Sequence, residues 1–212
     1  MKRTERHHLK QDELVTRLGH ASQWTREHQK MLVNGILVLA GAALLLGGLY
    51  IYRARQAELA RALLADALDR FHGIVGSEDA PEGADLPRFA TAEEKYRTAL
   101  ESLEKVANEY SSYDAGRQAR YYVGLCQGAL KDFAAAETSL QSLRSSDRDL
   151  LYYLSSKALA SMKTEQGDYA AAAEIYRPLV DDAENPLPKD YLLFELAKAE
   201  ERAGNLEQAR LY

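Results

Sequence analysis

Residues 31–52, MLVNGILVLAGAALLLGGLYIY, form the longest apolar stretch of the chain and contain no Asp, Glu, Lys, Arg or His. As a helix this stretch would extend about 33 Å, enough to cross a hydrocarbon layer roughly 30 Å thick. A core helix of a soluble protein is usually shorter and keeps one polar edge, whereas this stretch is apolar all round. The sequence therefore predicts a transmembrane helix over residues 31–52.

A cleaved signal peptide is the main alternative to an uncleaved anchor. It predicts a short basic start, an apolar region of about 7–15 residues and small residues at the cleavage site. Here a leader of 30 residues precedes the apolar stretch, the stretch is longer, and IYRARQ follows it. These features favour an uncleaved anchor.

Charge is distributed unevenly along the 212 residues. Residues 1–30 carry seven Lys and Arg against four acidic residues, whereas residues 53–212 carry 20 against 28. The acidic excess leaves few basic side chains to neutralise phosphates, so no nucleic-acid partner is expected. The basic residues of the short tail favour a cytoplasmic location for residues 1–30, because a long C-terminal domain is translocated largely regardless of its charge.

The apolar stretch also contains a weak sequence signal for the association of two copies of this helix. Ala43 and Gly47 form a small-x-x-x-small pair, which would let two membrane helices pack closely as a homodimer.

Residues 53–110 are expected to contain two helices and a loop. The first helix continues past the span, because apolar residues keep helical spacing at Leu59, Leu63, Ala67, Leu68 and Phe71. Several Gly and Pro residues predict a loop over residues 73–89. The second helix, over residues 90–110, carries one apolar face formed by Tyr96, Ala99, Leu100, Leu103, Val106 and Tyr110.

Residues 111–212 contain three segments that align without a gap. They are VGLCQGALKDFAAAETSLQSL from Val123, LASMKTEQGDYAAAAEIYRPL from Leu159 and LAKAEERAGNLEQARLY from Leu196. Successive segments begin 36 and then 37 residues apart. We refer to them as the first, second and third segments.

Each segment predicts two helices joined by a tight turn. The first helix carries a small residue that lets the second approach closely, at Gly124, Ala160 and Ala197. In the turn, Gly supplies the positive φ that ends a helix and Asp or Asn caps the next one, in Lys131-Asp132-Phe133, Gly167-Asp168-Tyr169 and Gly204-Asn205-Leu206. The second helix repeats an inward face at Ala136, Ala172 and Ala209, then at Leu140, Tyr176, Leu143 and Leu179.

These segments resemble the tetratricopeptide repeat family, whose period is about 34 residues. The resemblance covers about half of the chain and implies an all-α protein in which an α-solenoid follows a single N-terminal transmembrane helix. The chain departs from the family at Lys131, where a turn glycine is expected. It departs again where the family prefers an aromatic residue, at Gln127, Lys163 and Glu200.

The third segment stops at Tyr212, a few residues into its second helix. A repeat stack normally ends with a polar capping helix. The sequence is therefore expected to be a fragment, or a partner is expected to cover that end.

The resemblance implies a protein-binding groove on the inner curve of the stack, where first-helix side chains are exposed. The matching positions are Gln118, Tyr121, Leu125, Leu154, Lys157, Ser161, Tyr191, Phe194 and Lys198. Exposed aromatic and aliphatic side chains among a few Lys suit extended or helical peptides. The alternative is that some of these side chains pack against a neighbouring helix.

No catalytic or cofactor-binding motif accompanies this pattern. G-x-S-x-G, H-E-x-x-H and phosphate-binding glycine loops are absent from the sequence. Cys126 has no nearby His and is expected to be a small core residue. The His residues at positions 7, 8, 20 and 28 lack the spacing of metal ligands. We therefore expect neither an enzyme nor a cofactor or metal.

The order of these parts is similar to that of a bacterial family of membrane-anchored periplasmic tetratricopeptide repeat proteins, which includes the ancillary subunit of the Sec translocon. LKQDEL near the start and ATAEEKYRTALESLEKVANEY after the anchor resemble that family in order and spacing. The resemblance implies a single-pass inner-membrane protein with a cytoplasmic N-terminus. Its periplasmic domain would bind exported polypeptides, envelope chaperones or translocon subunits.

Two other functions remain open at this point. One is a scaffold for cell-envelope assembly or division complexes that binds a folded partner. The other is a cytoplasmic-facing repeat domain that regulates an enzyme.

Overall fold

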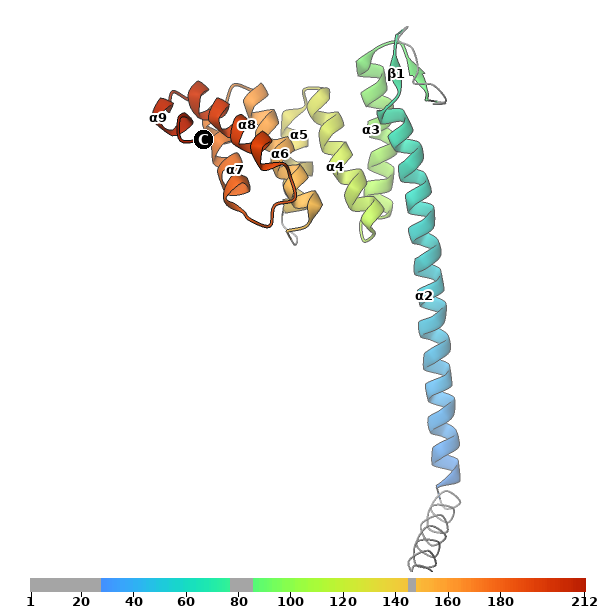
Figure 1. Ribbon diagram of the computed structural model, residues 1–212. Helices are drawn as coiled ribbons and strands as arrows, with labels where there is room; N and C mark the ends of the chain where they lie inside the picture. The colour runs from blue at the N-terminus through green and yellow to red at the C-terminus, as the bar shows by residue number, and fades with distance from the viewer. Residues whose placement is uncertain (1–27, 77–85, 145–147) are drawn as a thin grey trace, which may run out of the picture. The chain divides into compact units, whose positions relative to one another are not determined.

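The computed structural model describes residues 28–76, 86–144 and 148–212, and the chain divides into two compact units, Met1–Arg55 and Gln56–Tyr212 (Figure 1). The described residues form eight helices and two short strands. The expectation of a mostly helical protein is therefore confirmed. The predicted tail, residues 1–30, lies almost wholly outside the described residues.

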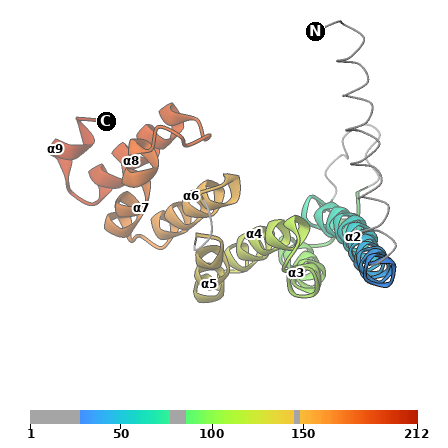
Figure 2. The ribbon, with the colours of Figure 1, turned by 90° about the horizontal axis from the view of Figure 1, so that it is seen from below.

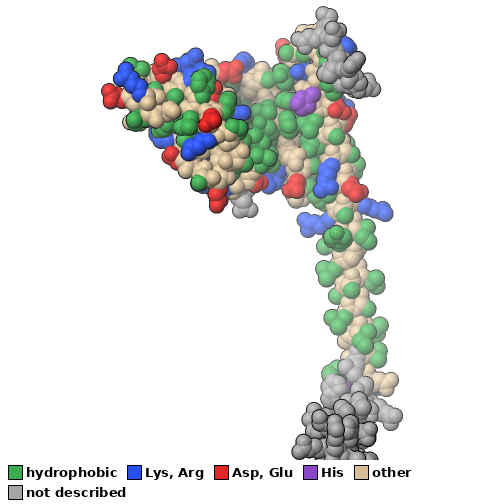
Figure 3. Space-filling view, in the orientation of Figure 1, with side chains coloured by type: hydrophobic (Ala, Val, Ile, Leu, Met, Phe, Trp, Pro, Cys, Tyr) green, Lys and Arg blue, Asp and Glu red, His purple; other side chains and the backbone are tan. Residues whose placement is uncertain are grey.

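Helix α2, Gln29–Phe71, begins in the first unit and ends in the second. In the first unit its apolar side chains are exposed, and Leu44 and Leu45 reach 78% and 77% exposure. Figure 3 shows hydrophobic side chains along this part of the helix. The helix is long and apolar enough to cross a membrane, and none of its most apolar 18-residue window is buried. The predicted continuation past residue 52 is confirmed.

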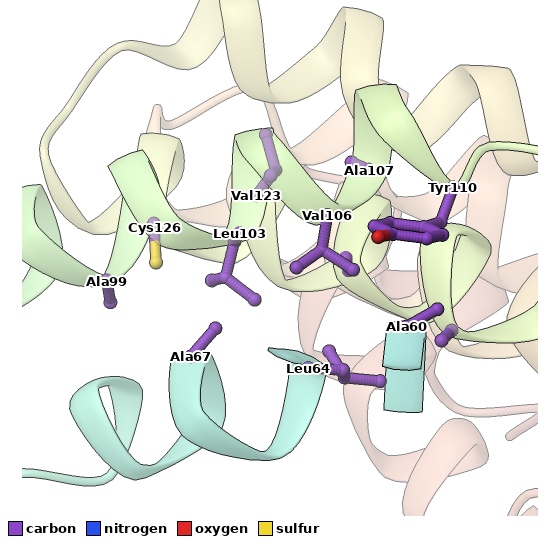
Figure 4. Packing of buried hydrophobic residues seen from close by; sticks show 12 residues of the cluster. Ala60, Leu64, Ala67, Ala99, Leu103, Val106, Ala107, Tyr110, Val123 and Cys126 are labelled. Atoms are coloured by element: carbon purple, nitrogen blue, oxygen red, sulfur yellow. The ribbon is translucent and has the colours of Figure 1, made fainter. Parts of the chain in front are cut away.

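In the second unit, α2 packs on α3, Ala92–Glu109. Ala60, Leu64 and Ala67 of α2 join Leu103 and Val106 of α3 in one buried cluster (Figure 4). Ala and Leu at helical spacing form the contact face on α2, while the outward positions carry charged residues. The apolar face predicted for residues 90–110 is the one that is buried.

Helix α3 begins with reciprocal capping. The Thr91 hydroxyl accepts a hydrogen bond from the Glu94 backbone N–H at 3.1 Å, and the Glu94 carboxylate accepts one from the Ala90 N–H at 2.9 Å. This capping box satisfies two backbone donors that have no partner within the helix. It sets the start of α3 two residues after the predicted position.

The segment predicted as a loop contains two short strands, which the sequence pattern missed. β1, Ile74–Val75, pairs in parallel with β2, Arg88–Phe89, so that Ile74 lies opposite Arg88. Two-residue strands are too short to show an alternating pattern among the Gly and Pro residues that surround them.

Six further helices follow one another in the second unit: α4 Asp114–Ala129, α5 Phe133–Arg144, α6 Leu150–Glu165, α7 Tyr169–Asp181, α8 Lys189–Arg202 and α9 Leu206–Ala209. Each packs against the next. Figure 2 shows α4, α6 and α8 along one side of this unit and α5 and α7 along the other. Helices α4, α6 and α8 therefore lie on the same side of this unit.

The predicted turns have the same backbone conformation in all three segments. Lys131, Gly167 and Gly204 have φ of 65°, 80° and 86°. The N–H of the residue after each donates to a carbonyl five residues earlier, at 2.8–2.9 Å, which is the Schellman arrangement. Lys131 thus adopts the left-handed conformation that glycine adopts in the other two turns.

The predicted caps form in two of the three turns. The side chains of Asp132 and Asp168 each accept a hydrogen bond at 3.2 Å, from the N–H of Ala135 and of Ala171. Asn205 makes no such bond, so its predicted capping role is wrong. Its side-chain amide instead donates to the Glu200 carboxylate at 2.8 Å. A charged carboxylate is a stronger hydrogen-bond acceptor than a neutral group, and this one is buried away from water.

The close approach predicted at the small residues is present. A Cβ at Gly124 would lie 2.6 Å from Cγ of Leu140, so α4 and α5 can pack this closely only without a side chain at that position. Ala136 and Ala172 are fully buried on the facing second helices, and Leu140 and Tyr176 are buried beside them.

We expect Gly124→Ala to destabilise the second unit by about 1–3 kcal/mol, because its methyl group would overlap Leu140 in a packed interface. Gly128→Ala is the matched control on the same helix, since its nearest neighbour, Sδ of Met162, lies 4.0 Å from the added Cβ. The control should be neutral or stabilising by up to about 1 kcal/mol through helix propensity. Urea unfolding followed by circular dichroism gives the free energy of unfolding of both variants. An equal change in the two would contradict the role of Gly124 in close helix packing.

Candidate functional site

The nine predicted groove residues lie on α4, α6 and α8. Five of them line one open pocket of the second unit, with a volume of about 280 Å³: Tyr121, Leu125, Lys157, Ser161 and Tyr191. Residues from three separate helices therefore meet at one site.

Six further residues complete this pocket, and the sequence reasoning missed them: Gly124, Gly128, Leu140, Ala158, Met162 and Glu165. Gly124 and Gly128 are one turn apart on the same face of α4, where the lack of side chains leaves room above Leu140 and Met162. That four-residue spacing of glycines was a signal visible in the sequence. Leu140 was assigned to the core, but its packing against Gly124 also places it in the pocket lining.

The other four predicted residues lie elsewhere. Gln118 is exposed and Leu154 is half-buried, and neither lines this pocket. Phe194 and Lys198 instead line a second pocket of about 480 Å³ between α8 and α9. Seven of the nine predicted residues thus divide between two pockets, because α9 packs beside the turn of α8 that follows Tyr191, and Gln118 and Leu154 line neither.

An aromatic cluster supports one wall of the first pocket. The rings of Tyr121 and Tyr122 on α4 lie 5.3 Å apart, and Tyr122 is 5.1 Å from Phe71 at the end of α2. Tyr96 of α3 is 5.8 Å from Phe71. Figure 3 shows hydrophobic side chains gathered over this part of the second unit. Of these rings only Tyr121 lines the pocket, and the contact with Tyr122, itself packed on Phe71, supports it from behind.

The opposite wall combines an aromatic ring with a cation. Nζ of Lys157 lies 4.7 Å from the centroid of the Tyr191 ring, within the range of a cation–π interaction. Burial raises the pKa of Tyr191, and the Glu195 carboxylate raises it further. Burial and the neighbouring Tyr122 likewise raise the pKa of Tyr121. Both hydroxyls are therefore neutral hydrogen-bonding groups at physiological pH.

Gln127, Lys163 and Glu200, which occupy corresponding positions on α4, α6 and α8, each make a polar contact between helices. Ser139 donates to Gln127 at 2.8 Å, and Lys163 pairs with Glu137 at 2.8 Å. Glu200 accepts hydrogen bonds from Arg177 and Asn205. Each polar residue on a first helix is thus bonded to a second helix, α5 or α7.

Glu200 is fully buried, so its carboxylate can stay ionised only because Arg177 and Asn205 take the place of water as hydrogen-bond donors. Burial alone would raise the pKa of its carboxyl group. The hydrogen bonds from Asn205 and Arg177, with the positive charge of Arg177, outweigh burial and hold the pKa below its ordinary value. The carboxylate therefore links α7, α8 and the start of α9 in its ionised form.

Glu200→Gln is expected to lower stability at pH 7 by about 1–2 kcal/mol, because it removes the charge from a buried hydrogen-bonded pair. The folded-state pKa lies below the ordinary value of 4.5, so the ionised carboxylate stabilises the fold above that value. This contribution is lost as pH falls through the folded-state pKa. Urea unfolding at pH 7, 5 and 3 should therefore show the difference from the wild type shrinking below pH 4.5.

The exposed neighbour provides the control, because Glu201→Gln removes the same charge from solvent. It should change stability little at any of the three pH values. If Glu200→Gln lowered the free energy of unfolding by the same amount at pH 3 and pH 7, the assignment of an ionised Glu200 carboxylate in the folded state would be contradicted.

The described residues provide no arrangement typical of a reactive centre. Cys126 is fully buried, and burial raises the pKa of its thiol to about 12, so it lacks the thiolate character of a nucleophile. Within residues 28–76, 86–144 and 148–212, no group of three His, Cys, Asp or Glu residues is placed to hold a metal ion. His7, His8 and His20 lie outside the described residues. The pocket offers aromatic, aliphatic and hydrogen-bonding contacts to a ligand.

No protein-family model matches the chain, and no curated protein and no solved structure is significantly similar to it.

Proposed function

We propose that this chain is a membrane-anchored module that binds polypeptides at the bacterial cell envelope, close to the Sec translocon. The observation that carries the proposal is the open pocket in which Tyr121, Leu125, Lys157, Ser161 and Tyr191 converge from three helices. Leu125 and Ser161 occupy corresponding positions in the first two aligned segments, which resemble tetratricopeptide repeats, and Tyr121 and Lys157 occupy corresponding positions just before them. The bound polypeptides would be newly exported chains or the chaperones that accompany them.

The composition of the pocket supports a polypeptide as the ligand. Tyrosine rings offer large contact areas with little loss of side-chain freedom, and they can bond to a peptide backbone as well as to apolar side chains. The cavity of about 280 Å³ is large enough for one or two side chains. A shallow site of this size favours brief binding to many sequences over tight binding to one.

The anchor supports the proposed location. The exposed apolar part of α2 would lie in the bilayer, and the basic excess of residues 1–30 favours the cytoplasmic side for the N-terminus. The second unit would then lie in the periplasm, where exported chains emerge unfolded.

One observation favours a second function, a scaffold that holds a folded partner in cell-envelope assembly or division. At the α8–α9 end, Phe194 and Leu206 are 63% and 55% exposed around the second pocket. Exposed apolar residues that adjoin a pocket are typical of a contact with a folded surface. This function would use α8 and α9, whereas the proposed one uses α4, α6 and α8.

The proposed topology predicts that the chain resists extraction from bacterial membranes by alkaline carbonate. A reporter enzyme that is active only outside the cytoplasm should be active when fused after Tyr212. A reporter that is active only in the cytoplasm should be inactive at the same position. Carbonate-soluble protein would contradict the anchor, and the reverse reporter pattern would favour the cytoplasmic-facing regulatory domain.

Photo-crosslinking in living cells tests the bound species. A photoreactive phenylalanine analogue at Tyr191, which is 39% exposed and lines the pocket, should crosslink to newly exported polypeptides and to translocon subunits. Glu174, exposed on α7 and outside the pocket, is the control position and should give at least about tenfold less crosslinked product.

The pattern of products separates the two functions. One defined envelope protein at Tyr191, or crosslinks that concentrate at Phe194, would favour the scaffold. If the same crosslinked products formed at Glu174 and at Tyr191, the pocket would not select a ligand, and the proposed function would be contradicted.

A further inference from the structure

Two tyrosines and two arginines end the exposed apolar part of α2. Tyr50 and Tyr52 are the last aromatic residues of the apolar stretch, and Arg53 and Arg55 follow directly. All four side chains are exposed, the two tyrosines by 76% and 60%. Figure 3 shows basic side chains that project to both sides of the helix just beyond its hydrophobic part. All four residues belong to the first unit, Met1–Arg55.

The charges of Arg53 and Arg55 are not balanced within the described part of the chain. Neither guanidinium forms an ion pair there, whereas Arg97 and Arg148 each pair with a carboxylate, at 2.7 and 2.8 Å. The sequence also places no Asp or Glu anywhere in residues 28–57. The positive charge of both arginines is therefore available to an anionic ligand.

Helix geometry places these residues on two opposite sides of α2. Tyr50 and Arg53 are three residues apart and share one side, and Tyr52 and Arg55 share another. At about 100° per residue, the centres of the two pairs lie about 160° apart around the helix. A folded partner would cover one side of a helix, whereas lipids surround it. The arrangement therefore favours lipid as the ligand.

The spacing of charges along α2 matches the thickness of a bilayer. Lys30 is exposed before the apolar stretch and Arg53 after it, and their helical separation is about 35 Å. The hydrocarbon layer between the two headgroup regions is roughly 30 Å thick. Tyrosine rings favour this boundary, because the ring suits the acyl chains and the hydroxyl suits water. An inserted α2 would thus hold Arg53 and Arg55 at the level of lipid phosphates.

We propose that Arg53 and Arg55 each bind the headgroup of an anionic phospholipid on their own side of α2. Tyr50 and Tyr52 are positioning residues that keep the two guanidinium groups at the depth of the phosphates. A guanidinium can donate two parallel hydrogen bonds to phosphate oxygens. Phosphatidylglycerol is preferred to phosphatidylethanolamine, because the ammonium group of the latter repels the unbalanced charge of the arginines.

This site rests on the proposed insertion of α2 in a membrane and is independent of the pocket in the second unit. The full-length chain is placed in nanodiscs of phosphatidylglycerol and phosphatidylethanolamine in equal amounts with identical acyl chains. Native mass spectrometry of the released chain identifies the lipids that it retains. Phosphatidylglycerol should exceed phosphatidylethanolamine about fivefold, which is the effect of one basic residue near each headgroup.

Glutamine and lysine variants test the two arginines. Arg53→Gln and Arg55→Gln should each lose about half of the retained phosphatidylglycerol, because the two sites lie on opposite sides of the helix. The double glutamine variant should retain the two lipids in the ratio of the nanodisc. The double lysine variant keeps the charge without the paired hydrogen bonds, so it should keep a preference of at least about twofold.

A second double variant is the matched control. Arg61→Gln with Lys105→Gln removes the same net charge from two exposed residues of the second unit that form no ion pair within the described residues. It should leave the retained lipids unchanged. An excess of inorganic phosphate in the buffer should also leave them unchanged, because a free ion lacks the acyl chains that hold a lipid beside the helix. Size-exclusion chromatography confirms that every variant enters the nanodisc.

The possible failures are distinguishable. A chain that does not enter nanodiscs and is soluble in carbonate would overturn both the proposed anchor and this lipid site. An inserted wild type that retains the two lipids in the bulk ratio would overturn only the lipid site. The same conclusion would follow if the control variant lost the preference, if the glutamine variant kept it, or if the lysine variant lacked it. Displacement of the lipids by inorganic phosphate would indicate a general anion site and would also overturn the proposal.

Discussion

The close approach of paired helices at positions without large side chains is the constraint on which the second unit depends. Gly124 lets Leu140 lie directly against α4, and the fully buried Ala136 and Ala172 let the second helices approach in the same way. Short interhelical distances bring α4, α6 and α8 onto one side of the unit, so their side chains can meet in one pocket. The same glycine that permits packing also leaves the space that the pocket occupies. The packing of α4 on α5 at Gly124 therefore forms part of the buried core and part of the pocket.

Polar ties add specificity to this packing. Aromatic residues at positions 127, 163 and 200 would hold adjacent helices together through apolar area alone. This chain places Gln, Lys and Glu there, and each bonds to a defined partner on a second helix. Directional bonds of this kind favour one register between helices, since any shift would leave a buried polar group unpaired. The fully buried Glu200 is the clearest case, because its ionised carboxylate requires both Arg177 and Asn205.

Apolar surface is used in two ways along the chain. In the first unit, the side chains of α2 are exposed over a length that suits the interior of a bilayer. In the second unit, apolar residues are buried between helices, and the exposed Tyr191, Phe194 and Leu206 line the two pockets described above. A proposed role as an anchored polypeptide-binding module uses both kinds of surface. Within the second unit, the last turn of α2 supports the pocket residue Tyr121, because Phe71 packs on Tyr122 and Tyr122 packs on Tyr121.

The sequence by itself determined the helices, their turns and their inward faces. These features depend on local periodicity and on residues such as Asp132, Asp168 and Gly167, whose effects reach only a few positions along the chain. The turn at Lys131 was predicted from the aligned segments, but its left-handed conformation is a finding of the structure. Only the tertiary structure decided which groove residues meet, why Asn205 bonds to Glu200 and does not cap α9, and where β1 and β2 pair. Those outcomes depend on distances between residues far apart in sequence. Periodicity assigns a side chain to a face of its helix, but only packing decides what lies opposite it.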